Sequence, residues 1–393
     1  MTAAARITAI GLTERAKRAA KVAADFADKV DIEGRFPLEG MNALKAERLM
    51  GVMIRPEFGG EGATLTEVAD ICAILGQACA ATAMTYAMHQ IQIASLADYA
   101  VGSTWHEAFQ KRICDEQLLV ASATSEAGIG GNLRNSICAI EVDGDTARLT
   151  KDATVISYGA DADAIMVTSR RHPDAAHSDQ VATVFLKDQY TLEQTSKWDT
   201  LGMRGTCSDG YILKAEAPAG QILPRPFAEI AAQSMLAVSH LLWGALWYGI
   251  AADAVARGQA FVKNAARKAP GQVPPGALRL AEASSLLQLV KANVVAGLKQ
   301  FEGCKGNSDA LNAMSFSVAM NNVKIGTSQT ILTIINHCML ICGIAGYKNG
   351  TPFSLGRHLR DAHSAQLMIS NDRILGNTST MLLVNKQDTS LLG

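Results

Sequence analysis

The sequence predicts an α+β protein in three parts: an N-terminal helical domain, a middle β domain and a C-terminal helical bundle. Three observations lead to this prediction. Apolar residues recur at helical spacing in residues 1–117, short β-branched runs replace them in residues 118–224, and long alanine- and leucine-rich segments fill residues 225–393. Runs of helices and strands that occupy separate parts of a chain are typical of α+β folds.

In the first part, apolar residues recur at i, i+3, i+4 and i+7, namely Val68, Ile71, Cys72 and Leu75. This spacing places them on one face of a helix, and Thr64 or Thr66 is a candidate N-cap before it. Residues 56–62, Pro-Glu-Phe-Gly-Gly-Glu-Gly, interrupt the helical pattern. Proline and glycine so close together predict a loop there.

In the middle part, four β-branched runs predict strands, at residues 137–142, 147–149, 164–168 and 181–186. Asp143-Gly144 between the first two runs predicts a hairpin turn. Pro224 and Pro226 mark the boundary with the third part, whose helical pattern breaks at residues 268–276 in a loop rich in proline and glycine.

The composition points away from several functional classes. With 36 Lys and Arg against 37 Asp and Glu, no basic surface for nucleic acid is expected, and small molecules are the expected partners. Eight cysteines lie mostly in apolar runs, so we expect reduced thiols, a cytoplasmic protein and no metal site. Cys338 and Cys342 lie at i, i+4 beside His337, and core packing is favoured there over metal binding.

The N-terminus has no apolar segment of the kind that a secretion signal contains. Residues 230–252 carry no charged residue and are long enough to cross a membrane. Their first half is polar at Gln233, Ser234, Ser239 and His240, so a buried helix of the bundle is the better interpretation.

Separated motifs occur along the chain. Residues 124–132 read Thr-Ser-Glu-Ala-Gly-Ile-Gly-Gly-Asn, a loop whose glycines let a backbone approach a phosphate or ring closely. Residues 155–163 begin Val-Ile-Ser-Tyr-Gly, and residues 201–206 read Leu-Gly-Met-Arg-Gly-Thr. Residues 360–363 read Arg-Asp-Ala-His, and residues 343–347 read Gly-Ile-Ala-Gly-Tyr.

In this order and at these separations, the motifs resemble those of the acyl-CoA dehydrogenase superfamily. The resemblance spans nearly the whole chain and implies a barrel-like β domain, a C-terminal four-helix bundle and a flavin, FAD or alternatively FMN. It also implies a homodimer or homotetramer, with an electron-transferring flavoprotein or a flavin reductase as redox partner. The residues that it aligns with flavin contacts are Thr124, Ser125, Gly130, Gly131, Val155, Ser157, Arg257, Phe261 and Gly343. The resemblance implies that the segments with the last three residues reach the diphosphate and adenine of a neighbouring subunit's flavin.

The resemblance also shows a departure at the catalytic base. The superfamily has a glutamate nine residues after the arginine of its Arg-Asp motif, and this position is Ile369 here; an alternative position in the superfamily aligns with Gln233. Neither residue can accept a proton from a substrate. His363 and Asp372 are the candidate replacements, and His89 is a further histidine beside the implied substrate cavity, where a packed core histidine is at least as well supported.

Three functions follow from these observations. The first is dehydrogenation of an acyl thioester at its α,β bond, with hydride transfer to flavin. The second is a flavin-dependent monooxygenase of the same fold, an N- or aromatic hydroxylase that uses reduced flavin and oxygen and needs no α-proton base. The third is a protein that keeps the fold for binding or assembly alone.

Overall fold

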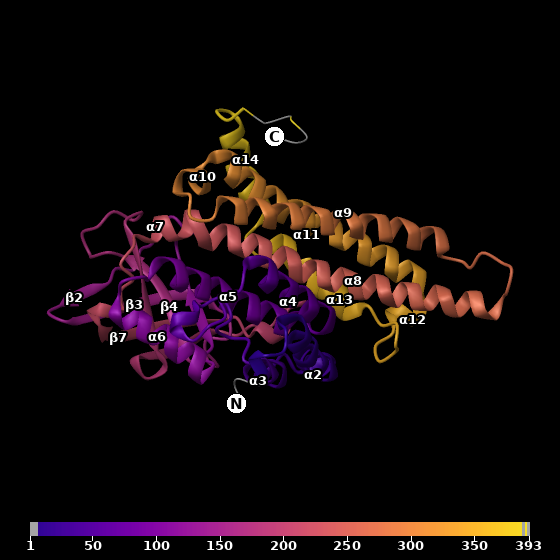
Figure 1. Cartoon of the computed structure of the whole chain (residues 1–393), viewed down its shortest axis with the longest axis horizontal. Helices are drawn as coiled ribbons and strands as arrows, with labels where there is room; N and C mark the ends of the chain where they lie inside the picture. Colours follow the sequence, from indigo (N-terminus) through magenta and orange to yellow (C-terminus); the bar gives the residue numbers. More distant parts are fainter. Residues whose placement is uncertain (1–6, 387–389, 391–393) are drawn as a thin grey trace.

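The computed structural model describes residues 7–386 and residue 390. The N-terminal part is helical, as predicted, and lies beneath the long helices of the C-terminal part (Figure 1). Its helices are α2 (Leu12–Glu33), α3 (Leu38–Ala46), α4 (Leu65–Ala78), α5 (Ala80–Tyr99) and α6 (Thr104–Glu116). The predicted loop at residues 56–62 contains one short 3₁₀ turn, Pro56–Phe58, because proline suits the first position of a helical turn.

Helix α4 begins where the sequence predicted. The Thr64 hydroxyl accepts a hydrogen bond from the Glu67 backbone N–H over 3.2 Å, and the Glu67 carboxylate accepts the Thr64 backbone N–H over 2.8 Å. This reciprocal capping box satisfies donors that the first turn leaves free. All four predicted apolar positions of this helix are fully buried. The helical periodicity and the Thr64 cap are therefore confirmed.

The middle part forms two sheets. One has the strand order β1-β4-β5 and the other β2-β3-β7-β6, and β1 runs parallel to β4 while the other pairs are antiparallel. The strands are β1 (Val120–Ala123), β2 (Glu141–Asp143), β3 (Thr146–Ile156), β4 (Ala164–Arg170), β5 (Gln180–Leu186), β6 (Tyr190–Ser196) and β7 (Asp209–Pro218). Short 3₁₀ turns occur at Lys187–Gln189, Arg204–Thr206 and Ala219–Gln221.

The hairpin predicted at Asp143-Gly144 joins β2 to β3, with Asp143 opposite Thr146. Strand β7 was not predicted. Its inward positions are Tyr211, Leu213, Ala215 and Ala217, and its outward positions include Lys214 and Glu216. Alanine, lysine and glutamate have low strand propensity, so pairing with β3 and β6 rather than local preference defines this strand.

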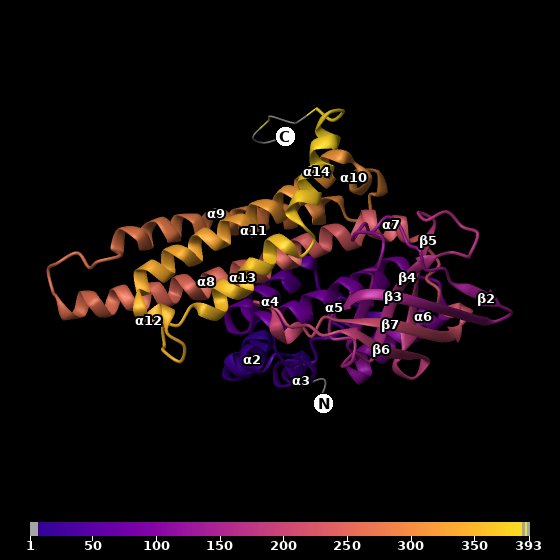
Figure 2. The same ribbon diagram turned by 180° about the vertical axis from the view of Figure 1, so that it is seen from behind.

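The C-terminal part is a bundle of long helices. Helices α8 (Leu236–Lys268), α9 (Ala277–Cys304) and α11 (Met314–Cys342) run side by side along the molecule, and α13 (Gly356–Leu367) lies beside them (Figures 1 and 2). Shorter elements are α7 (Phe227–Ile230), a π-helical turn (Ala231–Met235), α10 (Ser308–Asn312), α12 (Ile344–Tyr347) and α14 (Asn371–Leu382). The predicted fold class, helices followed by sheet and then a helical bundle, is confirmed.

By length and composition alone, the helical segments Phe227–Lys268 and Met314–Cys342 could each cross a membrane. The most apolar window of the first segment is 83% buried inside the protein. This burial is typical of a core helix and agrees with the interpretation of residues 230–252 as a bundle helix.

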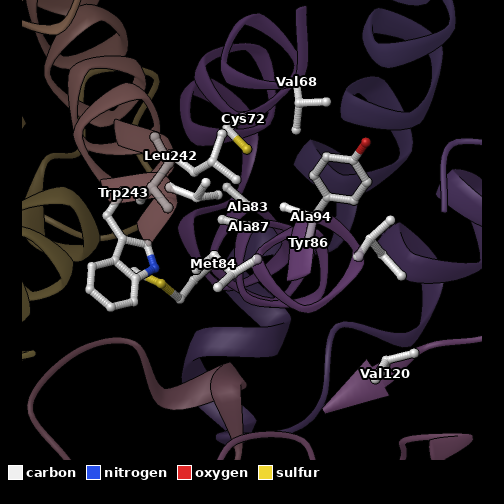
Figure 3. Packing of buried hydrophobic residues seen from close by; sticks show 14 of the residues in the cluster. Val68, Cys72, Ala83, Met84, Tyr86, Ala87, Ala94, Val120, Leu242 and Trp243 are labelled. Atoms are coloured by element: carbon white, nitrogen blue, oxygen red, sulfur yellow. The ribbon is translucent and has the colours of Figure 1, made fainter. Parts of the chain in front are cut away.

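The core joins the N-terminal helices directly to the bundle. Cys72 of α4, Met84 and Ala87 of α5, and Leu242 and Trp243 of α8 pack into one apolar cluster (Figure 3). At the crossing of α4 and α8 the two backbones touch. A Cβ atom added to Gly76 would lie 2.3 Å from the Leu246 carbonyl oxygen, and one added to Gly249 would lie 2.2 Å from that of Ala73. Only glycine permits this approach.

Gly249→Ala is therefore expected to lower the free energy of unfolding by about 1–3 kcal/mol, because the new methyl group forces two packed backbones apart. Urea denaturation measures the change. Gly303→Ala is the matched control on α9, where an added Cβ meets nothing within 4 Å. This control is expected to stabilise the helix by about 0.5–1 kcal/mol. Equal effects of the two substitutions would contradict the close crossing.

Candidate functional site

Ser125 brings two of the sequence motifs together. Its hydroxyl donates to the Val155 carbonyl oxygen over 2.6 Å and accepts from the Val155 backbone N–H over 3.1 Å. This pair fixes the loop that follows β1 to the end of β3. Because the hydroxyl hydrogen is used in the pair, Ser125 can offer a ligand only a lone pair. Thr124, the preceding residue, is half-buried.

Ser157 belongs to a chain of hydroxyl groups. Ser157 lies 2.8 Å from Ser208, which lies 2.9 Å from Thr206, and Thr206 donates to the Met203 carbonyl oxygen over 2.9 Å. Each hydroxyl carries one hydrogen, so the carbonyl at the end sets the direction of the whole chain. Ser157 donates to Ser208 and keeps its lone pairs for an N–H or O–H group of a ligand.

Glu126 anchors the glycine loop, residues 124–132, through hydrogen bonds to residues 136–138, a role that the sequence did not reveal. Its carboxylate is buried and accepts hydrogen bonds from the Ser136 hydroxyl over 2.7 Å and from the backbone N–H groups of Ile137 and Cys138. It also forms an ion pair of 3.4 Å with Lys151, whose side chain is fully buried. Burial lowers the pKa of this lysine, and the carboxylate opposes that shift.

The glycine loop itself is bound by α14. The Arg373 guanidinium donates to the carbonyl oxygens of Gly130 and Gly131, the latter over 2.6 Å. Both glycines have positive φ, 58° and 71°, which a residue with a side chain adopts only with strain. Space beside Gly130 is open, whereas a Cβ at Gly131 would meet the arginine at 2.5 Å.

The junction between α13 and α14 holds the position where the superfamily keeps its base. Ile369 lies there with φ 46°, an uncommon conformation for a β-branched residue. Its carbonyl oxygen accepts a hydrogen bond of 2.7 Å from Lys324 of α11. The Ile369 side chain can neither donate nor accept a proton, so the departure seen in the sequence stands in the structure.

Gln233 marks the alternative base position, and it lies in the π-helical turn. Its Oε1 atom accepts hydrogen bonds from the hydroxyl groups of Tyr99, over 3.3 Å, and Ser308, over 3.0 Å. Turns of this type occur frequently at functional sites. Burial raises the pKa of Tyr99 to about 12, so this hydroxyl remains a donor at neutral pH.

His89 is a structural histidine. Its Nδ1 atom accepts the Val120 backbone N–H over 3.0 Å, so Nε2 carries the hydrogen and donates to the Met50 carbonyl oxygen over 2.9 Å. Burial lowers the pKa of His89 to about 4. The neutral ring thus links the N-terminal domain to β1.

Neither candidate base is held by neighbouring side chains. His363 on α13 and Asp372 on α14 are exposed, and within the described part of the chain they make no hydrogen bond or ion pair.

Asp361, two residues before His363, is instead buried and accepts the Met203 backbone N–H over 2.7 Å. The Leu-Gly-Met-Arg-Gly-Thr and Arg-Asp motifs are therefore in contact, and Arg204 binds the backbone of Asp31 and Thr200 as part of the scaffold.

Three further predicted cofactor residues lie toward the other end of the bundle. Arg257 donates to Asp253 over 2.7 Å and to the Ser354 carbonyl oxygen over 3.1 Å. Phe261 packs edge-on against Phe353, with ring centroids 5.2 Å apart. Gly343 follows the last residue of α11 and is exposed. Gly343 stands directly before α12, which lies at the opposite side of the molecule from the β strands (Figure 1), so this end of the bundle is separate from the Ser125 and Ser157 cluster.

A groove of about 880 Å³ lies elsewhere, over β3, β6 and β7, with Arg148, Tyr190 and Lys214 in its lining. None of the predicted site residues lines it. The candidate site is therefore defined by side-chain contacts and not by this groove. It comprises Ser125, Val155, Ser157 and the glycine loop with Arg373.

Comparison with known proteins matches residues 12–105 to the acyl-CoA dehydrogenase N-terminal domain. The FMN-bound dibenzothiophene monooxygenase TdsC from Paenibacillus sp. A11-2 superposes with a TM-score of 0.84 over 96% of this chain and 98% of that one, at 18% identity. The chain has the acyl-CoA dehydrogenase fold. The fold that the motif resemblance implied is thereby confirmed.

Two other structures with this fold are similar to the chain. Nitrososynthase from Micromonospora carbonacea var. africana has a TM-score of 0.81 and 20% identity, and the match covers 95% of this chain and 96% of that one. KijD3 in complex with FMN and a dTDP-amino-keto sugar has a TM-score of 0.81 and 20% identity. That match covers 99% of this chain and 96% of the KijD3 chain. At these identities the likeness concerns the acyl-CoA dehydrogenase fold itself.

Proposed function

We propose that the protein is a flavin-dependent monooxygenase, which uses a reduced flavin and molecular oxygen to oxygenate a small molecule. The observation that carries the proposal is the absence of an acid at both positions where a dehydrogenase of this fold keeps its base, since they hold Ile369 and Gln233. Removal of an α-proton requires a positioned base, which contributes about 10²–10⁴ in rate. Oxygenation of an amine or aromatic substrate does not require that step.

The site residues fit a flavin ring. Val155 is 37% exposed beside the Ser125 pair and offers an apolar surface for a planar ring. The free lone pairs of Ser157 can accept a ring N–H, and the open side of Gly130 admits a phosphate-bearing chain. When bound, a reduced flavin supplies two electrons to oxygen, so that one oxygen atom enters the substrate and the other leaves as water.

FMN is the better candidate than FAD. The resemblance assigned Arg257, Phe261 and Gly343 to the diphosphate and adenine of FAD across a subunit contact. In the structure the Arg257 guanidinium is occupied by Asp253 and the Ser354 carbonyl oxygen, and Phe261 packs against Phe353. The TdsC and KijD3 structures contain FMN, which supports the smaller cofactor.

An oligomer, a homodimer or homotetramer, is part of the proposal. Large apolar side chains stand exposed on α9, α11 and α12: Leu278, Leu289, Leu340, Ile344 and Tyr347. The apolar window of α11 is only 44% buried within one chain. Exposed apolar side chains of this size favour contact with a second copy. We place the protein in the cytoplasm and expect a flavin reductase as its electron source.

The second candidate is the acyl thioester dehydrogenase, coupled to an electron-transferring flavoprotein. The match of residues 12–105 to the acyl-CoA dehydrogenase N-terminal domain favours it. It requires a base from outside the two usual positions, and His363 and Asp372 remain the candidates. Both side chains are exposed and have no partner among the described residues. Neither therefore has the fixed position that proton abstraction requires.

The test begins with cofactor binding. Titration of the apoprotein with FMN and FAD, followed by flavin fluorescence, is expected to show at least about tenfold tighter binding of FMN, equivalent to about 1.4 kcal/mol. The FMN-loaded protein is then mixed anaerobically with saturated acyl-CoAs of several chain lengths. We expect no loss of the blue flavin absorbance. Bleaching by any of them would establish the dehydrogenase instead.

The oxygenase is tested with indole as the probe, because indole is bound in one TdsC structure. Protein supplied with reduced FMN by a reductase is expected to consume oxygen and form an oxygenated indole, which mass spectrometry detects as a gain of one oxygen atom. The control is the reductase with FMN alone. If an extended panel of amines and aromatic compounds gives no oxygenated product, the monooxygenase proposal is wrong.

A further inference from the structure

Lys324 is the most unusual charged residue of the bundle. It lies in the middle of α11, its side chain is fully buried, and among the described residues it has no carboxylate partner. Burial alone lowers the pKa of its ammonium group to about 8. A lysine without an ion pair is rarely found at such a position, so its contacts indicate what it does.

Its hydrogen bonds both go to the segment where α13 gives way to α14. The ammonium group donates to the Ile369 carbonyl oxygen over 2.7 Å and to the Asn371 side-chain oxygen over 2.5 Å, and it lies 5.9 Å from the centre of the Trp247 ring. Asn371 donates in turn to the Ser328 hydroxyl over 3.1 Å. One cation thus holds a residue of the junction, Ile369, and the first residue of α14, Asn371.

The junction needs this support. Ile369 has φ 46°, a conformation that costs on the order of 1–3 kcal/mol for a non-glycine residue and persists only where its surroundings impose it. The backbone conformation at Ile369 sets the direction in which α14 leaves the bundle. Figures 1 and 2 show α14 standing away from the axis of α11 and α13, next to α10.

Helix α14 then reaches the β domain. Arg373, two residues after Asn371, donates to the carbonyl oxygens of Gly130 and Gly131. A line of direct contacts therefore runs from the ammonium group in the bundle, through the start of α14, to the glycine loop. Lys324 and Arg373 share no hydrogen bond, and the first turn of α14 connects their contacts.

We propose that Lys324 is a positioning residue for the glycine loop, which it holds through the α13–α14 junction and Arg373. The role of the loop in flavin binding rests on the function proposed above. The mechanical coupling itself does not, because it is defined by contacts within the chain.

The coupling is tested first without any cofactor. Hydrogen exchange of the backbone amides of residues 127–135 is measured in the apoprotein by mass spectrometry. Lys324→Met and Arg373→Ala are each expected to speed exchange in this segment, and the double variant is expected to match Arg373→Ala alone. Lys299→Met, a lysine exposed on α9, is the control and should leave exchange unchanged. Unchanged exchange in Lys324→Met would overturn the proposal.

Cofactor affinity gives the second measurement. Each single variant is expected to raise the Kd for FMN about tenfold, and the double variant is also expected to raise it about tenfold rather than a hundredfold. A merely structural lysine would give independent effects that multiply, and that result would overturn the proposal. If Lys324→Met does not fold, Asn371→Ala, which keeps the lysine and removes one of its acceptors, replaces it in both measurements.

The two proposals can fail separately. If the wild-type protein binds no flavin, the proposed function is wrong, and hydrogen exchange alone decides the role of Lys324. If the wild-type protein binds FMN and the two effects multiply, the proposed function stands and the coupling is wrong.

Discussion

Lowering the pH from 7 to 5 is expected to reduce the free energy of unfolding by about 5 kcal/mol. Three buried histidines dominate the effect. Burial lowers the pKa values of His89, His106 and His240 from 6.5 to about 4. The unfolded chain therefore binds more protons than the folded one between pH 6.5 and pH 4. The stability contributed by the neutral rings is complete above pH 6.5 and is lost as the pH falls through this window.

Each histidine accounts for about 2 kcal/mol at pH 5, and Asp361 opposes them by about 1 kcal/mol. Burial raises the pKa of this aspartate to about 6, so its protonation on acidification favours the folded state. Urea denaturation at several pH values measures the loss. His240→Leu is expected to remove about a third of the histidine contribution, because His240 is one of the three buried histidines. The substitution removes one hydrogen bond, of 3.3 Å to Met320.

His172→Gln is the control, because that histidine is exposed and its replacement should leave the pH profile unchanged. A flat stability profile between pH 7 and pH 5 in the wild-type protein would contradict the assignment of neutral, buried rings. If His240→Leu and the wild type lose the same free energy of unfolding between pH 7 and pH 5, His240 does not contribute to the effect. The explanation then rests on His89 and His106.

Glu126→Ala is expected to lower the free energy of unfolding by about 3–5 kcal/mol. The substitution leaves the buried ammonium group of Lys151 without its counter-charge and removes the acceptor of the Ile137 and Cys138 backbone N–H groups. A buried charge without a partner and unpaired buried donors both cost more than the lost interaction itself. Urea denaturation at pH 7 measures the change.

Glu216→Ala provides the matched comparison. Glu216 pairs with Arg148 over 2.8 Å, but both side chains are more than half exposed. Exposed pairs contribute about 0–1 kcal/mol, so this variant should remain close to the wild type. A loss below about 1 kcal/mol in Glu126→Ala would mean that water reaches Lys151 once the carboxylate is gone.

Local patterns predicted much of the fold. The Val68 to Leu75 spacing, the Thr64 cap and the Asp143-Gly144 turn depend on neighbouring residues, and all three are present in the structure. Strand β7 depends on its partners, because its alanines and charged residues carry little strand preference of their own. The sequence therefore predicts elements with local signals and misses those that pairing alone defines.

The candidate site was less accessible to sequence reasoning. The motifs identified Ser125, Val155 and Ser157, which the structure places together. They gave no indication of Arg373, whose contact with Gly130 spans 243 positions of the chain. Lys324 was also missed, because a single lysine in a helix normally faces water. One available signal was that no other charged residue occurs in residues 314–342, so this lysine interrupts a long apolar helix.

The glycine crossing of α4 and α8 has a consequence for synthesis of the chain. Gly76 and Gly249 are roughly 170 residues apart, so the contact is of high sequence separation. At about 5–20 residues per second, the ribosome needs about 9–35 s to pass from one to the other. Throughout this interval α4 can pack against α2 and α5, but the face that contacts α8 has no partner. The N-terminal third is thus an incomplete core during translation, exposed to chaperones and to other nascent chains until α8 emerges.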